Sequence, residues 1–172
     1  MLSLIREKVR QAIGILQEQQ VDVWLTFVRE TSAVFDPVLA LIYGANLTWP
    51  SALILTQTGE SIAIVGRYEA ETARRLKTFT EVIAYDQSIQ ADLLRTLDRL
   101  APRHIAVNTS ANDPSADGLT HGLYQLLTGY LTGSPHAGNL VSAEAVIGAL
   151  RGRKTPTEVD RIRQAAATTE EI

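Results

Sequence analysis

Hydrophobic residues recur at helical spacing in the first part of the chain. The apolar stripe consists of Ile5, Val9, Ala12, Ile13 and Leu16, and charged or amide side chains fill most positions between them. This period of three to four residues predicts an amphipathic helix. Residues 21–28 follow without that period and are rich in β-branched and aromatic side chains, so they predict a largely buried strand.

The next segment, residues 29–50, is harder to assign because polar and turn-forming residues interrupt every apolar run. Arg29-Glu30-Thr31-Ser32 and Asp36-Pro37 predict loop structure. Residues 38–43 have the composition of a short helix, and Gly44 suits the C-terminal end of such a helix.

Strands and helices alternate over residues 52–131. Two apolar runs, residues 52–55 and 61–65, flank a turn that contains Gly59 and predict an antiparallel hairpin. The elements predicted after the hairpin are a helix over 68–77, a strand over 82–85, a helix over 89–100, a strand over 104–108 and a helix over 119–131. This alternation predicts an α/β fold with a sheet flanked by helices, and the hairpin makes that sheet mixed.

The last part of the chain begins with a turn-rich break over residues 133–138. A short helix is predicted from Ser142 to Leu150. A second helix is predicted from Thr155-Pro156-Thr157-Glu158, because threonine caps, proline suits the first helical position and glutamate reaches back to the cap amide. No C-cap follows before Ile172, so this helix is expected to continue beyond the sequence.

Composition narrows the class of protein. The 172 residues are 45% hydrophobic and 20% charged, which is typical of a globular domain. The net charge of −3 argues against a nucleic-acid partner, and no apolar run approaches the length needed to span a membrane. Cysteine is absent, which excludes disulfides and thiolate sites and fits a cytoplasmic protein.

The sequence holds no self-contained catalytic or metal motif. There is no phosphate-binding loop and no nucleophile elbow, and the histidines (His104, His121 and His136) have no ligand spacing. We therefore expect no catalytic residue and no metal ligand in this chain. His136 stays a candidate for substrate access because it lies in a Gly/Pro loop, where binding residues concentrate; the alternative is a surface or half-buried imidazole.

Three further candidates for substrate access lie in the loop after the first predicted strand. Arg29 and Asp36 form a polar cluster there, and ligands gather at the carboxyl ends of strands in open α/β sheets. A solvated loop is the alternative. Trp49, before Pro50, fits either an exposed interface aromatic or a buried packing residue.

The run from Ser142 to Ala166 resembles the domain junction of the creatinase, prolidase and aminopeptidase P family, the pita-bread metallopeptidases. In that family a helix ending in Leu-Arg is followed by Lys-(Ser/Thr)-Pro-x-Glu and Ile-Arg-x-Ala. The matching residues here are Leu150-Arg151, Lys154-Thr155-Pro156-Thr157-Glu158 and Ile162-Arg163-Gln164-Ala165. The order of predicted elements upstream also resembles the family's amino-terminal domain, which has a ribonuclease-H-like fold with a mixed sheet. Where many relatives carry a Tyr-Leu-Thr-Gly-Phe-like run, this chain has Leu41-Ile42-Tyr43-Gly44.

The resemblance implies a domain organisation and a function. Residues 1–141 would form the amino-terminal domain, and residues 142–172 the linker helix and the start of the first helix of a missing catalytic domain. The chain would be the non-catalytic domain of an Xaa-Pro dipeptidase or aminopeptidase P-like metallopeptidase, shaping substrate access and dimerisation. Two divalent ions, manganese, cobalt or zinc, are expected in the full-length protein, on ligands outside this chain. The implied partners are the catalytic domain, a second copy of the chain and a peptide substrate.

Three alternatives remain open at this point. The parent protein could have lost its metals and serve as a protein-interaction module, or it could be a metal-free, creatinase-like hydrolase. A free-standing α/β small-molecule binder is the third alternative. That alternative predicts that the final helix is packed, so an exposed apolar face at Val159, Ile162 and Ala166 would count against it.

Overall fold

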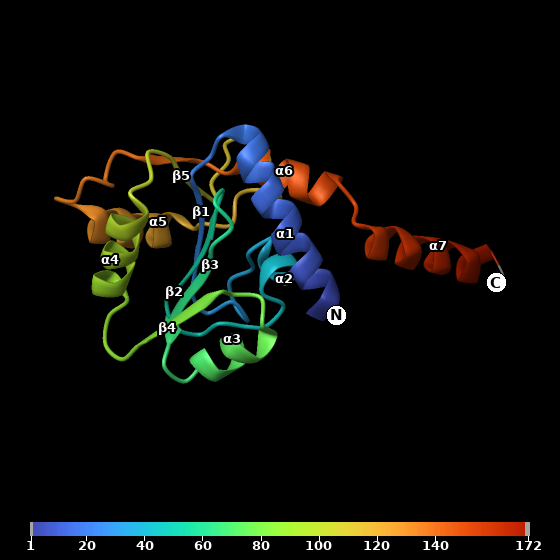
Figure 1. Ribbon diagram of the computed structural model, residues 1–172, viewed down its shortest axis with the longest axis horizontal. Coiled ribbons are helices and arrows are strands. Elements are labelled where there is room, and N and C mark those ends of the chain that lie inside the picture. The colour runs from blue at the N-terminus through green and yellow to red at the C-terminus, as the bar shows by residue number, and fades with distance from the viewer. Residues whose placement is uncertain (1, 171–172) are drawn as a thin grey trace.

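A six-stranded mixed sheet forms the middle layer of the computed structural model, which describes residues 2–170 (Figure 1). The strands are β1 (Val23–Val28), β2 (Ser51–Thr56), β3 (Ser61–Gly66), β4 (Glu81–Tyr85), β5 (Ile105–Val107) and β6 (Leu140–Ser142). Their order across the sheet is β4-β3-β2-β1-β5-β6. β2 is antiparallel to both of its neighbours, whereas the other pairings are parallel. The predicted mixed α/β sheet and the β2–β3 hairpin are confirmed.

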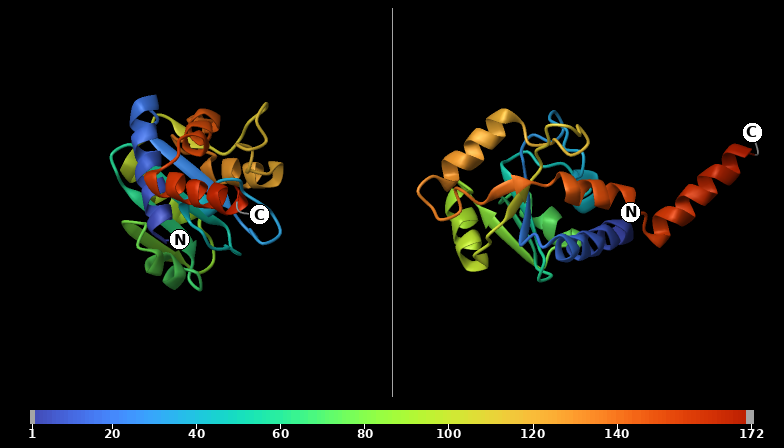
Figure 2. Two further views of the ribbon diagram at one scale, coloured as in Figure 1. Left: turned by 90° about the vertical axis from the view of Figure 1, so that its right-hand side faces the viewer. Right: turned by 90° about the horizontal axis from the view of Figure 1, so that it is seen from above.

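Helices cover both faces of this sheet (Figures 1 and 2). They are α1 (Leu2–Gln19), α2 (Leu39–Ile42), α3 (Ala70–Leu76), α4 (Gln90–Leu100), α5 (His121–Leu131), α6 (Glu144–Gly152) and α7 (Pro156–Glu170). Side chains of α1, α2, α3 and α6 share one hydrophobic core, and those of α4 and α5 share the other. The domain is therefore a three-layer α/β/α sandwich.

The strand residues alternate between these two cores. In β1, Trp24 packs on the α1 side and Leu25 on the α5 side, and both are almost fully buried. All six residues of β1, of β2 and of β3 are buried. Because both faces of the sheet are covered, the central strands read as continuous apolar runs without polar alternation.

The sequence pattern did not predict β6, the short edge strand. Leu140 pairs with Ile105 and Ser142 with Val107, in parallel register with β5. Val141 and Ser142 are exposed, so this segment carries no run of buried residues that would distinguish it from a loop. Its extended conformation follows from pairing with β5.

The last helix, α7, leaves the sandwich and projects away from it, as Figure 1 and the right-hand view of Figure 2 show. The predicted capping box is present at its first turn. The Thr155 hydroxyl accepts from the Glu158 amide at 3.2 Å, and the Glu158 carboxylate accepts from the Thr155 amide at 2.8 Å. The helix therefore begins where the sequence predicted. Its continuation past residue 170 lies outside the described residues.

Candidate functional site

The carboxyl ends of the five parallel strands meet at one edge of the sheet, and three of the four predicted candidates lie there. Arg29 directly follows β1, Asp36 lies further along the same loop, and Trp49 precedes β2, whose first residue pairs with the last residue of β1. His136 lies at the opposite edge, because its turn leads into β6 at the amino end of β5. The structure thus brings Arg29, Asp36 and Trp49 to one edge and leaves His136 apart.

The two limbs of the loop at this edge are joined by backbone hydrogen bonds. The Glu30 amide donates to the Thr48 carbonyl at 3.0 Å, and the Thr31 amide donates to the Leu47 carbonyl at 2.8 Å. Beyond this pairing the chain turns outward and exposes Phe35, whose exposed fraction is 77%. Arg29 is also exposed. This limb therefore presents a cation and an aromatic ring to solvent.

Asp36, in contrast, is a buried carboxylate inside a hydrogen-bond network. Its Oδ1 accepts from the amides of Val38 and Leu39 at 2.9 and 3.0 Å, just before α2. Its Oδ2 accepts from the Asn108 amide group at 2.9 Å. Burial raises the pKa of Asp36, although these hydrogen bonds act in the opposite direction. With both oxygens engaged by the protein, Asp36 holds the start of α2 against β5.

Asn108 connects this network to the sheet. Its side-chain oxygen accepts from the Trp24 indole at 2.7 Å, and its backbone carbonyl accepts from the amides of Gly118 and Leu119. Gly118 packs so closely that a Cβ at this position would lie 2.2 Å from Asp36 Oδ2. The carboxyl ends of β1 and β5 are thus joined by a buried polar cluster that tolerates no side chain at Gly118.

Trp49 stands at the centre of a group of aromatic rings at the same edge. Its ring lies 5.9 Å from that of Tyr68, edge to face, and 5.7 Å from that of Tyr85, tilted by 45°. The backbone of Gly66 supports the indole, because a Cβ there would lie 2.6 Å from Trp49 Cε3. Glu69 Oε1 accepts from the amides of Thr48 and Trp49, which fixes the approach to β2.

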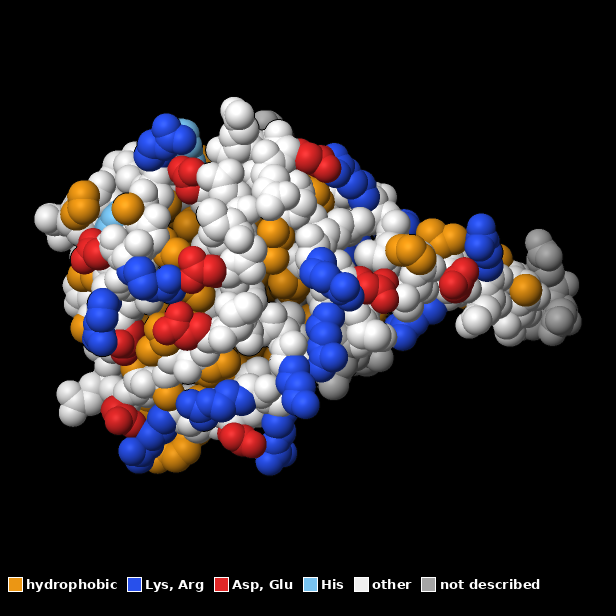
Figure 3. Space-filling model, viewed as in Figure 1, with side chains coloured by type: hydrophobic (Ala, Val, Ile, Leu, Met, Phe, Trp, Pro, Cys, Tyr) orange, Lys and Arg blue, Asp and Glu red, His pale blue; other side chains and the backbone are white. Residues whose placement is uncertain are grey.

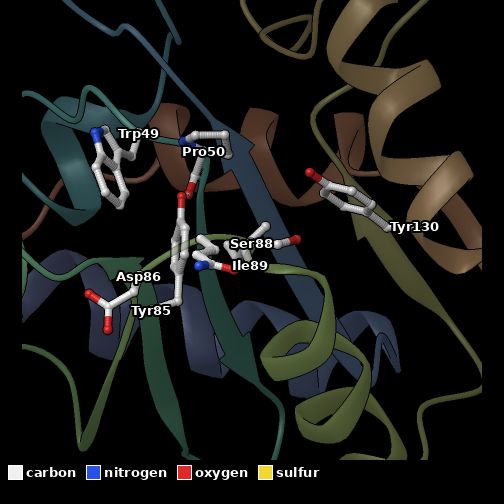
Figure 4. A pocket seen from close by; sticks show the side chains of 8 residues that line it. Trp49, Pro50, Tyr85, Asp86, Ser88, Ile89 and Tyr130 are labelled. Carbon is white, nitrogen blue, oxygen red and sulfur yellow. Dashed lines mark hydrogen bonds between the residues drawn. The ribbon is translucent and has the colours of Figure 1, made fainter.

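A hollow of about 260 Å³ opens beside Trp49 (Figure 4). It is lined by Trp49, Pro50, Tyr85, Asp86, Gln87, Ser88, Ile89 and Tyr130. The Tyr85 hydroxyl donates to the Pro50 carbonyl at 2.7 Å, and burial raises the pKa of this hydroxyl well above its usual range. Tyr85 is therefore a neutral donor that holds Pro50 at the rim.

The fourth candidate, His136, is buried in a structural contact. Its Nε2 lies 2.8 Å from the Asp98 carboxylate, near the end of α4. The His136 side chain is only 4% exposed, whereas that of Asp98 is 61% exposed. The imidazole thus ties the turn after α5 to α4.

A second feature lies at the base of α7 and centres on Lys8, a residue that the sequence pattern did not single out. Lys8 is 1% exposed, and its ammonium donates to the carbonyls of Leu150 and Arg153 at 2.8 and 2.9 Å. It also donates to Gln11 and forms an ion pair with Glu158 at 2.8 Å. One buried cation therefore holds the end of α6 and the start of α7 against α1.

A sequence signal for Lys8 does exist. It stands three residues after Ile5 and four before Ala12, so it lies on the apolar stripe of α1. A lysine in that position needs buried acceptors. Nothing in the sequence indicates that the carbonyl acceptors come from residues 142 and 145 positions away.

The described part of the chain offers no metal centre. Among residues 2–170, no three His, Cys, Asp or Glu side chains are gathered closely enough to hold an ion. These side chains do not provide a ligand set for the two divalent ions implied for the full-length protein. No reaction step on a metal is therefore assigned to this chain. Within the same residues, no helix has both the length and the apolar character to cross a membrane.

Solved structures share this fold, although no protein-family model and no curated protein matches the chain. An Xaa-Pro dipeptidase from Bacillus anthracis has a TM-score of 0.62 and 15% identity over 91% of this chain. An X-Pro aminopeptidase from Thermotoga maritima has a TM-score of 0.66 and 15% identity, also over 91%. The N-terminal domain of an Xaa-Pro dipeptidase from Lactobacillus brevis has a TM-score of 0.59 and 12% identity over 82%.

The coverage of these neighbours differs. The chain spans 38% of the Bacillus protein and 39% of the Thermotoga protein, but 98% of the Lactobacillus domain. The fold expected from the resemblance is thereby confirmed. The chain has the α/β fold of the amino-terminal domains found in Xaa-Pro dipeptidases and aminopeptidases P.

Proposed function

We propose that this chain is the non-catalytic amino-terminal domain of a metal-dependent Xaa-Pro dipeptidase or aminopeptidase P-like enzyme. In this proposal residues 1–141 form the domain, and residues 142–172 link it to a catalytic domain and begin that domain's first helix. The catalytic domain supplies the two divalent metals, and the whole protein is a cytoplasmic homodimer that acts on peptides.

The observation that carries the proposal is the form of α7. Its first turn is fixed by the capping box and by Lys8. The two hydrophobic cores of the described residues contain no side chain of α7. Ile162 is 53% exposed and Ala166 is exposed, and hydrophobic side chains are visible along α7 in Figure 3. A helix rigidly held at one end, with an uncovered apolar side, suits a connection to a second folded unit. Of the three residues named for the free-standing small-molecule binder, Ile162 and Ala166 are exposed and Val159 is half-buried, and the two exposed residues count against that alternative.

The loop at the carboxyl edge is the region proposed to shape substrate access. Arg29 and Phe35 are exposed there and Trp49 is half-buried, so these side chains are available to a peptide or to a neighbouring domain. Asp36 contributes indirectly in this proposal, by holding the loop in place.

The test compares the 172-residue chain with the full-length protein. The chain alone is expected to hydrolyse no Xaa-Pro dipeptide with manganese or cobalt, whereas the full-length protein should. In the full-length protein, Arg29→Ala and Trp49→Ala should raise KM more than they lower kcat, and Tyr124→Ala on α5 serves as the control. Metal-dependent turnover by the chain alone, or a full-length protein without peptidase activity, would contradict the proposal. Activity that survives exhaustive chelation would favour the metal-free hydrolase.

A further inference from the structure

We propose that a second hollow, lined by Thr48, Trp49, Tyr68 and Glu69, binds a quaternary ammonium group such as that of choline or of a trimethylated lysine. This Glu69 hollow has a volume of about 220 Å³. Sites for whole drug-sized ligands start at about 300 Å³, so the hollow suits a single head group. The inference goes beyond the proposed function, because it concerns binding without hydrolysis and two residues, Tyr68 and Glu69, that are not proposed to shape substrate access.

Two aromatic rings form walls of the Glu69 hollow at right angles to each other. The Tyr68 and Trp49 rings lie 5.9 Å apart and are inclined at 89°. Trp49 is half-buried against the backbone of Gly66, whereas Tyr68 is 74% exposed. A flat group stacks on one face at a time, but a rounded quaternary ammonium group can place methyl groups against both walls. The aromatic electrons attract its positive charge.

The Glu69 carboxylate supplies a negative charge beside these rings. Its Oε1 accepts from the Thr48 amide at 2.5 Å and from the Trp49 amide at 3.4 Å. Its Oε2 is buried and has no hydrogen-bond partner in the described part of the chain. Neither oxygen is therefore available as an acceptor for a ligand at the surface of the hollow, and the carboxylate acts through its charge.

This arrangement favours a quaternary ammonium group over a primary one. A primary ammonium group carries three N–H donors, and it would give up hydrogen bonds to water without new acceptors in the Glu69 hollow. A quaternary ammonium group has no N–H donor, so entering the hollow leaves no hydrogen bond unmade. It gains contact with two rings and the attraction of one carboxylate.

The neighbouring charges do not cancel that attraction. Arg67 lies over one face of the Tyr68 ring, 4.9 Å from its centroid, which shows that this ring accepts a cation. Arg67 does not line the hollow and is paired with Asp86 at 3.1 Å, so the pair adds no net charge. The two donors to Glu69 are backbone amides, which carry no formal charge. The lining therefore disfavours phosphates and carboxylates.

Tryptophan fluorescence tests the proposal with the 172-residue chain at constant ionic strength. Trp24 is 1% exposed and bonded to Asn108, so a ligand-induced change in emission reports Trp49. Choline chloride should change the emission and saturate. Dimethylbutanol, in which a carbon atom replaces the nitrogen of choline, should bind at least about fivefold more weakly, and so should butylammonium. Calorimetric titration provides a second readout that needs no tryptophan.

A second pair of probes distinguishes a free small molecule from a protein side chain as the source of the group. Trimethyllysine and lysine, each blocked at both ends, differ only in the three methyl groups. Trimethyllysine should bind, and lysine should bind at least about fivefold more weakly. Tighter binding of trimethyllysine than of choline would identify a side chain as the source, and the reverse order would identify a small molecule.

Variants at the start of α3 locate the site. Glu69→Gln keeps an acceptor for the two amides but removes the charge, so it should weaken choline binding about tenfold. Tyr68→Ala removes one wall and should weaken it about fivefold. Glu71→Gln, at an exposed carboxylate that pairs with Arg75 outside the hollow, is the matched control and should change nothing. Circular dichroism establishes that each variant is folded.

Three results would overturn the proposal. The first is the absence of saturation by both choline and trimethyllysine at millimolar concentration. The second is binding of dimethylbutanol or butylammonium as tight as that of choline, which would show that neither the charge nor the methyl groups are recognised. The third is equal weakening of choline binding by Glu69→Gln and Glu71→Gln, which would place the ligand elsewhere.

Discussion

The Lys8 ammonium lies 2.8 Å from the Glu158 carboxylate, which joins the first helix of the chain to the last. Lys8 is almost completely buried, and the Glu158 side chain is 15% exposed. The same ammonium binds two carbonyls at the end of α6. Together with the hydrogen bond from the Thr157 hydroxyl to the Glu7 carboxylate at 2.7 Å, these Lys8 contacts tie the start of α7 to α1.

We predict that Lys8→Met destabilises the chain by about 3–5 kcal/mol, because it leaves a partly buried carboxylate and two carbonyls without their donor. Urea unfolding measures the loss. Lys77→Met, at an exposed lysine, should change the unfolding free energy by no more than about 0.5 kcal/mol. Equal effects of the two substitutions would contradict the structural role of Lys8.

The Glu158 contact also predicts a dependence on pH. Burial on its own raises the pKa of Glu158, but hydrogen bonds from Lys8 and the Thr155 amide, with the charges of Lys8 and Lys154, lower it below 4.5. A carboxyl whose pKa is lower in the folded chain adds stability above its unfolded pKa and loses it as pH falls through the folded pKa.

Glu158→Gln should therefore cost stability at neutral pH and reduce the loss of stability as the pH falls below 4.5. Unfolding free energies across the acid range measure this effect. Asp160→Asn, at an exposed carboxylate on the same helix, is the matched control. It should leave the slope of unfolding free energy against pH nearly unchanged. An unchanged slope in Glu158→Gln would contradict the prediction.

Asp36→Ala should destabilise the chain by about 2–4 kcal/mol, since it removes the acceptor at the start of α2 and leaves the Asn108 amide group without this partner. Asp36→Asn keeps an acceptor for the Val38 and Leu39 amides and should cost less. Thermal and urea unfolding measure both. A change below about 0.5 kcal/mol in Asp36→Ala would favour a solvated loop residue.

Gly118→Ala should destabilise the chain by about 1–3 kcal/mol, because its Cβ would overlap Asp36 Oδ2 and lie 2.8 Å from Pro37 Cδ. Gly129→Ala is the matched control. It lies within α5 with nothing within 4 Å of the added carbon, so it should stabilise the chain by up to about 1 kcal/mol. Equal changes in unfolding free energy for the two variants would contradict the conclusion that close packing requires glycine at position 118.

Local features of this fold could be predicted from the sequence because their partners are close in the chain. The capping box joins Thr155 to Glu158, three positions apart, and both of its hydrogen bonds are present. The hairpin around Gly59 is equally local, and Gly59 has the positive φ of 100° that favours glycine. Hydrophobic period and turn residues suffice for such elements.

The roles of buried polar residues could not be predicted in the same way. Asp36 follows a predicted strand and reads as a solvated loop residue, yet its partner Asn108 is 72 positions away. Lys8 finds its acceptors across nearly the whole chain. The orientation of such a side chain depends on the assembled fold. The local hydrophobic pattern therefore does not predict it.

The position of β1 in the middle of the sheet has a consequence for how the chain folds. One side of β1 is completed by β2, its neighbour in sequence, while the other side pairs Val23 with Ile105. Closing that long loop costs chain entropy before any contact compensates for it, so we expect β1, β2 and β3 to assemble first and β5 to join late. Pulse-labelled hydrogen exchange should then protect the amides of Ile54 and Ile62 before that of Ala106. The chain would spend its early folding time with one edge of β1 open, which is the state most exposed to pairing with another copy.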